Sequence, residues 1–399
     1  MKKFRFLIFL LICFVIGFVF TFLVYMGLWS SFIASLNRIP VWMYFLMIPL
    51  VFYITLTCHE LGHLIAFRVQ GVPIRALYLT IFVFYKDKKG WHFTVKPKLW
   101  ILFGGLVIPD LPQVKNDEQF TTLRRIFARA LIAAPIVTIS LLAISVISFI
   151  LTWLFGAPSY WFGILSIFTI YTILLSSLYI YTFKLNTKHM YGDFVAYRKM
   201  NEDELFQFVQ MTQYIALSLQ ADEDHTYLYH KAQTLIEKQS RIKYQMFLMI
   251  TVMTYLEGVI DHQYPISEKI DQMLKKIPTA QFARSEEGLT LLYMVSAYHY
   301  QLGRVEESYQ LFNKITKKAS KRIPEAFRTY LKYKYEHKLN MKNHHAYLAN
   351  NDNIYIGQNW LFEVIEDPYE SAKKDHNQLP FQLYVCDVPE EKEKMSSED

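Results

Sequence analysis

Four long apolar runs dominate the first half of the chain. They cover about residues 4–29, 41–67, 130–155 and 161–183. Each run is long enough for a helix to cross roughly 30 Å of hydrocarbon. The first run is longer than the apolar core of a secretory signal peptide, so we interpret it as a retained span. The pattern predicts a polytopic membrane protein with about four transmembrane helices.

Two shorter apolar segments, Ala76–Tyr85 and Leu99–Pro109, lie between the second and third runs. Both are too short to cross a bilayer, and the alternation of side chains there is typical of β-strands. Non-helical backbone at membrane depth must pair or line a cavity. The sequence therefore predicts a small re-entrant β-hairpin packed against the helices.

Residues 200–345 show apolar positions at helical spacing, which predicts a cytoplasmic α-helical domain. The stretch Leu292–Ile315 is similar to one tetratricopeptide helix pair, with an ordinary helical bundle as the alternative. Residues 346–399 form an irregular region that ends in a charged, acidic tail. The expected fold is mostly α, with a membrane-embedded domain at 1–199 followed by this repeat-like domain.

The distribution of Lys and Arg among the loops predicts how the chain is oriented in the membrane. The segment 68–129 carries eleven Lys and Arg, whereas the turn at 156–160 carries none. The positive-inside rule then predicts that both termini are cytoplasmic. Because much of the net charge of +7 sits in these loops, it does not indicate nucleic acid. No Gly-rich phosphate loop is present, so we expect neither nucleotide nor nucleic acid as a partner.

Cysteine usage excludes a disulfide framework. The chain has 3 Cys, which lie far apart and follow no ligand spacing. The membrane is expected to be a bacterial cell membrane, because the chain is compact and has no organelle signals.

The candidate chemistry lies in the second apolar run, where Cys58 is followed by His59-Glu60-Leu61-Gly62-His63. Histidines four positions apart project from one face of a helix and can bind one Zn²⁺. Glu60 can take the proton from a zinc-activated water that attacks a peptide carbonyl. Ionisable groups inside a span are costly and usually functional. The motif predicts a zinc metalloprotease with one Zn²⁺ per chain.

A catalytic zinc site needs a third protein ligand and one open position. Asp193, which follows the fourth run, is the leading candidate, with a helix N-cap as its structural alternative. His189 and His92 are weaker candidates. Glu257 with Asp261 is another option, but these residues lie beyond the membrane-embedded domain.

These residues resemble the site-2 protease family of intramembrane zinc proteases over about residues 40–200. Besides the His59–His63 motif, Ala133–Thr138 looks like the family's small-Gly-Pro-x-x-Asn element, and Gly192-Asp193 looks like its Leu-Asp-Gly motif. Gly104-Gly105 resembles the glycine pair of the family's membrane hairpin. The resemblance implies Asp193 as third zinc ligand. It also implies the following substrate-contacting residues: Gly104, Gly105, Pro135 and Thr138.

The resemblance further implies a membrane-spanning or membrane-associated peptide as substrate, added as a strand to the hairpin edge. A cytoplasmic protein partner could bind the helical domain. The chain departs from the family pattern at Ala134, Thr138 and Phe194, where Gly, Asn and Gly are usual. These departures leave a second hypothesis: an inactive relative that works as a membrane scaffold or as a peptide-binding, export or immunity component.

Overall fold

The computed structural model describes residues 2–102, 104–187, 190–219, 225–367, 369–370 and 379–381. The chain divides into two compact units. The membrane unit comprises residues 1–109 and 125–201, and the helical unit comprises residues 110–124 and 202–399. We describe each unit separately.

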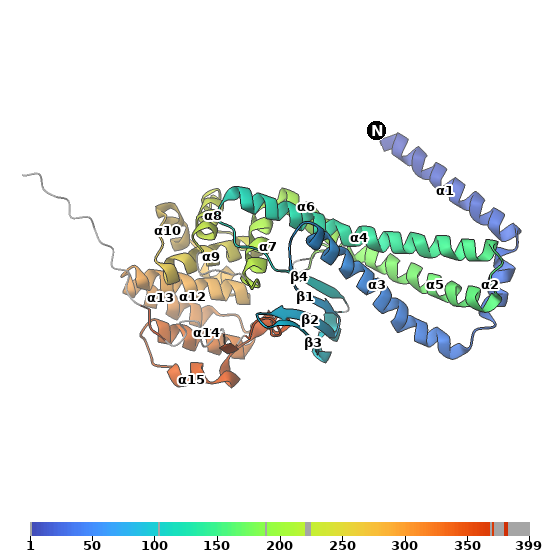
Figure 1. The fold of residues 1–399 in the computed structure, drawn as a ribbon. Coiled ribbons are helices and arrows are strands. Elements are labelled where there is room, and N and C mark those ends of the chain that lie inside the picture. Colours follow the sequence, from blue (N-terminus) through green and yellow to red (C-terminus); the bar gives the residue numbers. More distant parts are fainter. Residues whose placement is uncertain are drawn as a thin grey trace, which may run out of the picture. The chain divides into compact units, whose positions relative to one another are not determined.

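Three helices of the membrane unit are long and apolar enough to cross a bilayer: α3 (Val41–Val69), α4 (Asp117–Leu154) and α5 (Ser159–Thr182). Figure 1 shows them in blue and green. The first expected span is interrupted. Helix α1 (Lys2–Tyr25) ends at a turn where Gly27 has φ 93°, and α2 (Leu28–Leu36) continues at a 66° bend. If this bent pair counts as one span, the number of spans is four, as expected.

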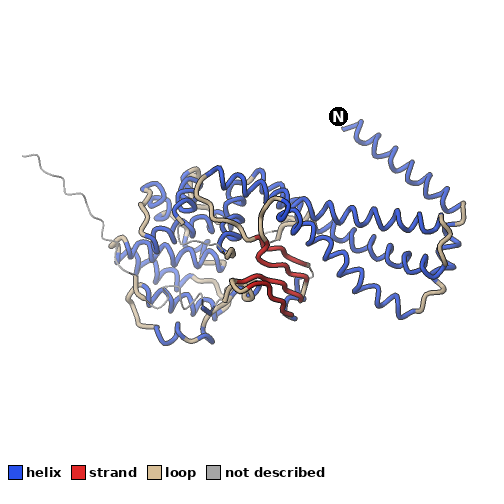
Figure 2. The backbone as a smooth tube through the Cα atoms, viewed as in Figure 1, coloured by secondary structure: helices blue, strands red, loops and turns tan. Residues whose placement is uncertain are grey.

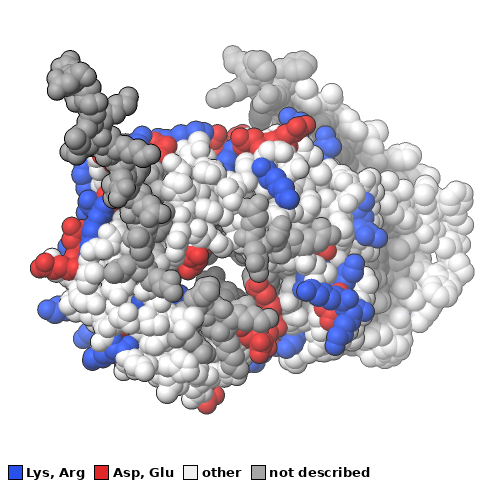
Figure 3. All heavy atoms as spheres, turned by 60° about the vertical axis from the view of Figure 1, so that its left-hand side comes forward, with Lys and Arg blue, Asp and Glu red and all other residues white. Residues whose placement is uncertain are grey.

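The surface of the membrane unit is apolar. Among the described residues, every exposed large apolar side chain except Leu379 lies before residue 198, and examples on α3 and α5 are Phe45 and Leu174. Figure 3 shows a wide area without Lys, Arg, Asp or Glu. Large exposed apolar surface is unfavourable in water and favourable in lipid. These helices are therefore suited to a bilayer.

The expected β-element is larger than a hairpin. Four strands form one antiparallel sheet in the order β3-β2-β1-β4 (Figure 2, red). Their bounds are Ile74–Leu79 (β1), Phe82–Asp87 (β2), Gly90–Val95 (β3) and Gly105–Pro109 (β4). A short 3₁₀-helix, Pro97–Leu102, leads into β4. In this order β4 is an edge strand, and no strand in the described part of the chain pairs with its other side.

The helical unit consists of consecutive helices joined by short loops. They are α7 (Glu204–Ala216), α8 (Thr226–Glu237), α9 (Met246–His262), α10 (Glu268–Lys275), α11 (Thr279–Phe282), α12 (Glu286–Gln301), α13 (Val305–Lys318), α14 (Glu325–Lys338) and α15 (His345–Ala349). The stretch compared with a tetratricopeptide pair is the α12–α13 hairpin, which turns at Gly303 with φ 74°. Its helices are joined by a buried hydrogen bond from Ser296 Oγ to the Ser308 carbonyl. The hairpin is present, and its assignment to that repeat family stays a prediction.

Candidate metal centre

Helix α3 brings the two histidines of the motif to one place. Because they are one turn apart, their rings lie together, with centroids 5.1 Å apart. His59 and Glu60 are 6% and 4% exposed. Ionisable side chains buried at this level need partners or a bound ion.

The chain after α5 turns back, which places Asp193 beside the two histidines. Asp193 begins α6 (Asp193–Glu202), and its carboxylate oxygens lie 3.3 Å from His59 Nε2 and 3.9 Å from His63 Nε2. The turn depends on Gly192, since a Cβ at this position would lie 2.1 Å from the Thr182 carbonyl oxygen. The Gly192 amide donates to the Leu185 carbonyl at 2.9 Å, which holds the reversal.

Helix α4 orients both imidazole rings. His63 Nδ1 lies 2.8 Å from the Ala130 carbonyl oxygen, which can only accept, so Nδ1 carries the proton. His59 Nδ1 lies 2.9 Å from Thr138 Oγ1, and that hydroxyl donates to the Ala134 carbonyl at 3.2 Å. Thr138 must therefore accept from His59. Both rings then direct an unprotonated Nε2 toward Asp193, as metal ligands require.

This orientation depends on the close approach of α3 and α4. A Cβ on Gly62 would lie 2.7 Å from the Ala134 Cα, so glycine lets the two backbones touch. Ala130, Ala134 and Thr138 are spaced by four along α4 and form one stripe beneath the histidines. Thr138 and Pro135 are buried, and the Thr138 hydroxyl contacts His59.

Glu60 is enclosed by the edge strand β4. A Cβ on Gly105 would lie 2.5 Å from Glu60 Cγ and 2.6 Å from its Cδ, so the strand backbone rests on the carboxylate side chain. Glu60 Oε2 is buried and has no hydrogen-bond partner among the described residues. The hydroxyls of Thr55 and Ser176 share this property. Buried polar atoms without partners mark places where water or an ion can bind.

His59, His63 and Asp193 form a group that could hold a metal ion, because one ligand atom from each lies within 4.8 Å of the others. Two neutral imidazoles and one carboxylate match the donor set of catalytic zinc. The residues therefore fit the metal that the sequence predicts.

A family model described as Peptidase family M50 matches residues 47–331, which is more than half of the chain. The chain belongs to peptidase family M50. This is the site-2 protease family, so the resemblance found in the sequence is confirmed. Membership indicates an intramembrane metalloprotease and a membrane protein. No curated protein matches the chain, and no solved structure matches it.

Aromatic rings of this M50 peptidase confine the metal-binding group. The His59 imidazole stacks on Phe183 and Tyr179, with centroid distances of 5.2 Å and 5.7 Å. Sequence reasoning did not single out these two residues, which lie in the last turn of α5 and directly after it. Both Tyr179 and Phe183 lie within a generally aromatic run, so composition alone does not separate them from lipid-facing residues.

The other candidate ligands lie elsewhere or outside the described residues. His92 on β3 pairs with Asp87 on β2 at 3.0 Å, and its side chain is 39% exposed. This ion pair gives His92 a structural role within the sheet. Glu257 and Asp261 lie on α9 of the helical unit. His189 lies outside the described residues.

Proposed function

We propose that this M50 peptidase is a zinc endopeptidase whose metal is held by His59 Nε2, His63 Nε2 and the Asp193 carboxylate. The observation that carries the proposal is the convergence of these three donors within 4.8 Å, with both Nδ1 atoms engaged by α4. Zinc supplies Lewis acidity, polarising the peptide carbonyl and lowering the pKa of the attacking water.

Glu60 is the proposed general base. Its carboxylate would accept the proton of the attacking water and pass it to the leaving amine. The side chain is buried under β4, and its free oxygen has no competing hydrogen bond among the described residues. A scaffold protein gains nothing from an unpaired buried carboxylate, which costs stability. This burial therefore favours catalysis over the scaffold hypothesis.

The proposed substrate is a membrane-spanning or membrane-associated peptide that binds in extended form. The open side of β4 offers backbone hydrogen-bonding groups next to Glu60. A peptide pairing with this edge would present its own backbone to the catalytic group. The substrate segment must unwind for this, so small or helix-breaking residues near the cleaved bond would ease binding.

The membrane, the orientation and the partner of the enzyme are proposed from its sequence. We propose a bacterial cell membrane with both termini in the cytoplasm, and the basic loops support this orientation. We also propose a cytoplasmic partner protein at the helical domain. Deletion of residues 202–399 tests this role, and unchanged cleavage and substrate choice would exclude it.

The test of the metal assignment is zinc content in full-length protein purified in detergent. We expect about one zinc per chain in wild type, loss of zinc in His59→Ala and in Asp193→Ala, and wild-type zinc in the matched control His92→Ala. Zinc retained in Asp193→Ala would move the third ligand elsewhere. A wild-type protein without zinc would contradict the proposed function.

A further inference from the structure

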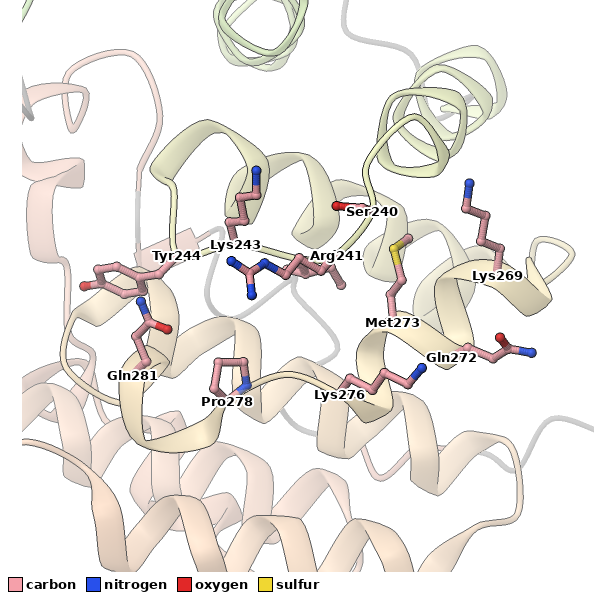
Figure 4. A pocket seen from close by; sticks show the side chains of 11 residues that line it. Ser240, Arg241, Lys243, Tyr244, Lys269, Gln272, Met273, Lys276, Pro278 and Gln281 are labelled. Atoms are coloured by element: carbon pink, nitrogen blue, oxygen red, sulfur yellow. The ribbon is translucent and has the colours of Figure 1, made fainter.

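The helical unit contains a hollow with a basic lining. Its volume is about 630 Å³, and it lies between the loop joining α8 to α9 and the segment from α10 to α11. Arg241 and Lys243 come from the loop, and Lys269 and Lys276 come from the facing segment. Figure 4 shows the two groups across from each other. The residues that line the hollow include no Asp or Glu.

Two carboxylates on the neighbouring helices, Glu237 and Asp271, are engaged mainly by groups outside the lining. Glu237 at the end of α8 accepts hydrogen bonds from Ser267 Oγ at 2.5 Å and from Gln233 Nε2 at 3.1 Å. The hydrogen bonds from Ser267 and Gln233 hold its pKa below the usual range. Asp271 on α10 is occupied by Arg304 and Lys275, at 2.6 Å and 3.1 Å.

Three of the four cations have no acidic partner among the described residues. The fourth, Lys269, donates from Nζ to the backbone carbonyl of Glu237 at 2.5 Å, and its charge contributes to the lowered pKa of the Glu237 carboxyl. Within the described part of the chain, no ion pair involves Arg241, Lys243 or Lys276. Arg241, Lys243 and Lys276 carry like charges around one concavity and repel each other, and a bound anion relieves that repulsion.

The dimensions and walls of the hollow indicate what kind of anion fits. Its volume lies within the range of small-molecule sites. Ile242 and Met273 are buried and give it an apolar floor, while Tyr244 and Pro278 form one end (Figure 4). A compact ligand with several negative charges can lie within the hollow, whereas an extended acidic peptide would pass only part of its charge through it.

We propose that this hollow binds a small ligand with clustered phosphate groups. Arg241 supplies a planar fork suited to phosphate oxygens, and the lysines supply point charges around it. Such a site needs no Gly-rich loop, because side chains replace backbone amides. The sequence therefore gave no signal for it. The proposal goes beyond the proteolytic function and does not depend on it.

The experiment is a binding titration of full-length protein in detergent at low salt. The probes are tripolyphosphate, adenosine triphosphate, inositol trisphosphate and, as an acidic peptide, hexaglutamate. We expect saturable binding of the phosphate probes with Kd below about 1 mM, weakened by added salt. Tighter binding of the nucleotide indicates a soluble source of the phosphates, and tighter binding of the inositol compound indicates a lipid headgroup.

Matched variants decide whether the phosphate probes bind in the hollow. Arg241→Gln with Lys276→Gln should weaken phosphate binding at least about tenfold. Arg322→Gln with Lys314→Gln removes the same charges from exposed sites outside the hollow and should leave Kd within about twofold. His59→Ala should bind like wild type, which separates this site from the metal centre. Equal Kd values in both double variants, hexaglutamate binding as tightly as tripolyphosphate, or no saturable phosphate binding would overturn the proposal.

Discussion

Buried carboxylates have different partners in the two units. In the helical unit, Asp271 has a 10% exposed side chain, accepts hydrogen bonds from Tyr298 and Arg304 and pairs with Lys275. In the membrane unit, the buried Glu60 and the partly buried Asp193 form no ion pair with Lys or Arg among the described residues. A buried carboxylate with its cation beside it is already compensated. A buried carboxylate oxygen with neither a cation nor a hydrogen-bond donor among the described residues, such as Glu60 Oε2, indicates a place for a metal ion or a proton.

The comparison predicts its largest effect at Glu60. Glu60→Gln keeps the shape of the side chain but removes the base, so cleavage of a single-span peptide should fall about a thousandfold or more. Zinc content should stay at the wild-type level, because Glu60 is not a proposed ligand. The control Glu257→Gln changes an exposed carboxylate and should cleave normally. Near-wild-type cleavage by Glu60→Gln would remove the contrast between the units.

The second effect concerns the strand that rests on Glu60. Gly105→Ala places a methyl group 2.5 Å from Glu60 Cγ, so either the strand or the carboxylate must shift. Displacement of a catalytic group by about 1 Å can cost roughly a hundredfold in rate. We expect a loss of roughly tenfold to a hundredfold in cleavage. Gly17→Ala has nothing within 4 Å and is the matched control. Equal rates in both variants would show that Gly105 does not position Glu60.

A third prediction separates orientation of a ligand from contact with substrate. Thr138→Val leaves the buried Nδ1–H of His59 without an acceptor, so zinc affinity should fall about tenfold to a hundredfold. Thr138→Ser keeps the hydroxyl and should retain zinc. Competition with a chelator measures both variants. An unchanged zinc affinity together with a raised KM in Thr138→Val would assign Thr138 to the substrate instead.

The smallest effect is expected in the helical unit. Burial alone would raise the pKa of Asp271, but hydrogen bonds from Arg304, Lys275 and Tyr298 hold this pKa below its usual range. A lowered folded-state pKa stabilises the protein above the unfolded value of about 3.9. This stabilisation is lost as the pH falls through the lower, folded-state pKa.

Arg304→Gln should accordingly destabilise this region by about 2 kcal/mol at neutral pH. Hydrogen exchange in peptides from α10 and α12 measures the change, and the difference from wild type should vanish in acid. The matched control Lys275→Gln removes a partner that is 46% exposed and should have a smaller effect. A difference that persists in acid would show that Arg304 acts through packing rather than through Asp271.

The parts of the membrane unit that follow local rules were predictable. The apolar runs locate α3 and α5 within a few residues, because lipid requires unbroken apolar helices. The His59–His63 spacing depends only on helical geometry. Contacts between segments far apart in the chain could not be predicted from local sequence patterns. The hydrogen bond between His59 Nδ1 and the Thr138 hydroxyl and the stacking of Phe183 on His59 depend on how α4 and the end of α5 approach α3.

The break at Gly27 and the four-stranded sheet also escaped sequence reasoning. The apolar run continues through Gly27, so composition alone does not show the turn. Strand β2 ends in the charged pair Lys86-Asp87, and β3 follows after only two residues, so the two strands are not separated by a clear change in the apolar pattern. The sequence did indicate β-structure in this segment, but the pairing of β4 with β1 joins strands separated by two others.

The order of the three proposed ligands along the chain has a consequence for biosynthesis. His59 and His63 emerge from the ribosome early, whereas Asp193 emerges only after α4 and α5 have been made. Insertion of the last span is thus the event that completes the donor set. A half-made chain holds two histidines and a general base but not the third ligand. The proposed protease stays inactive during its own membrane insertion, when unfolded segments of its own chain and of neighbouring nascent proteins are within reach.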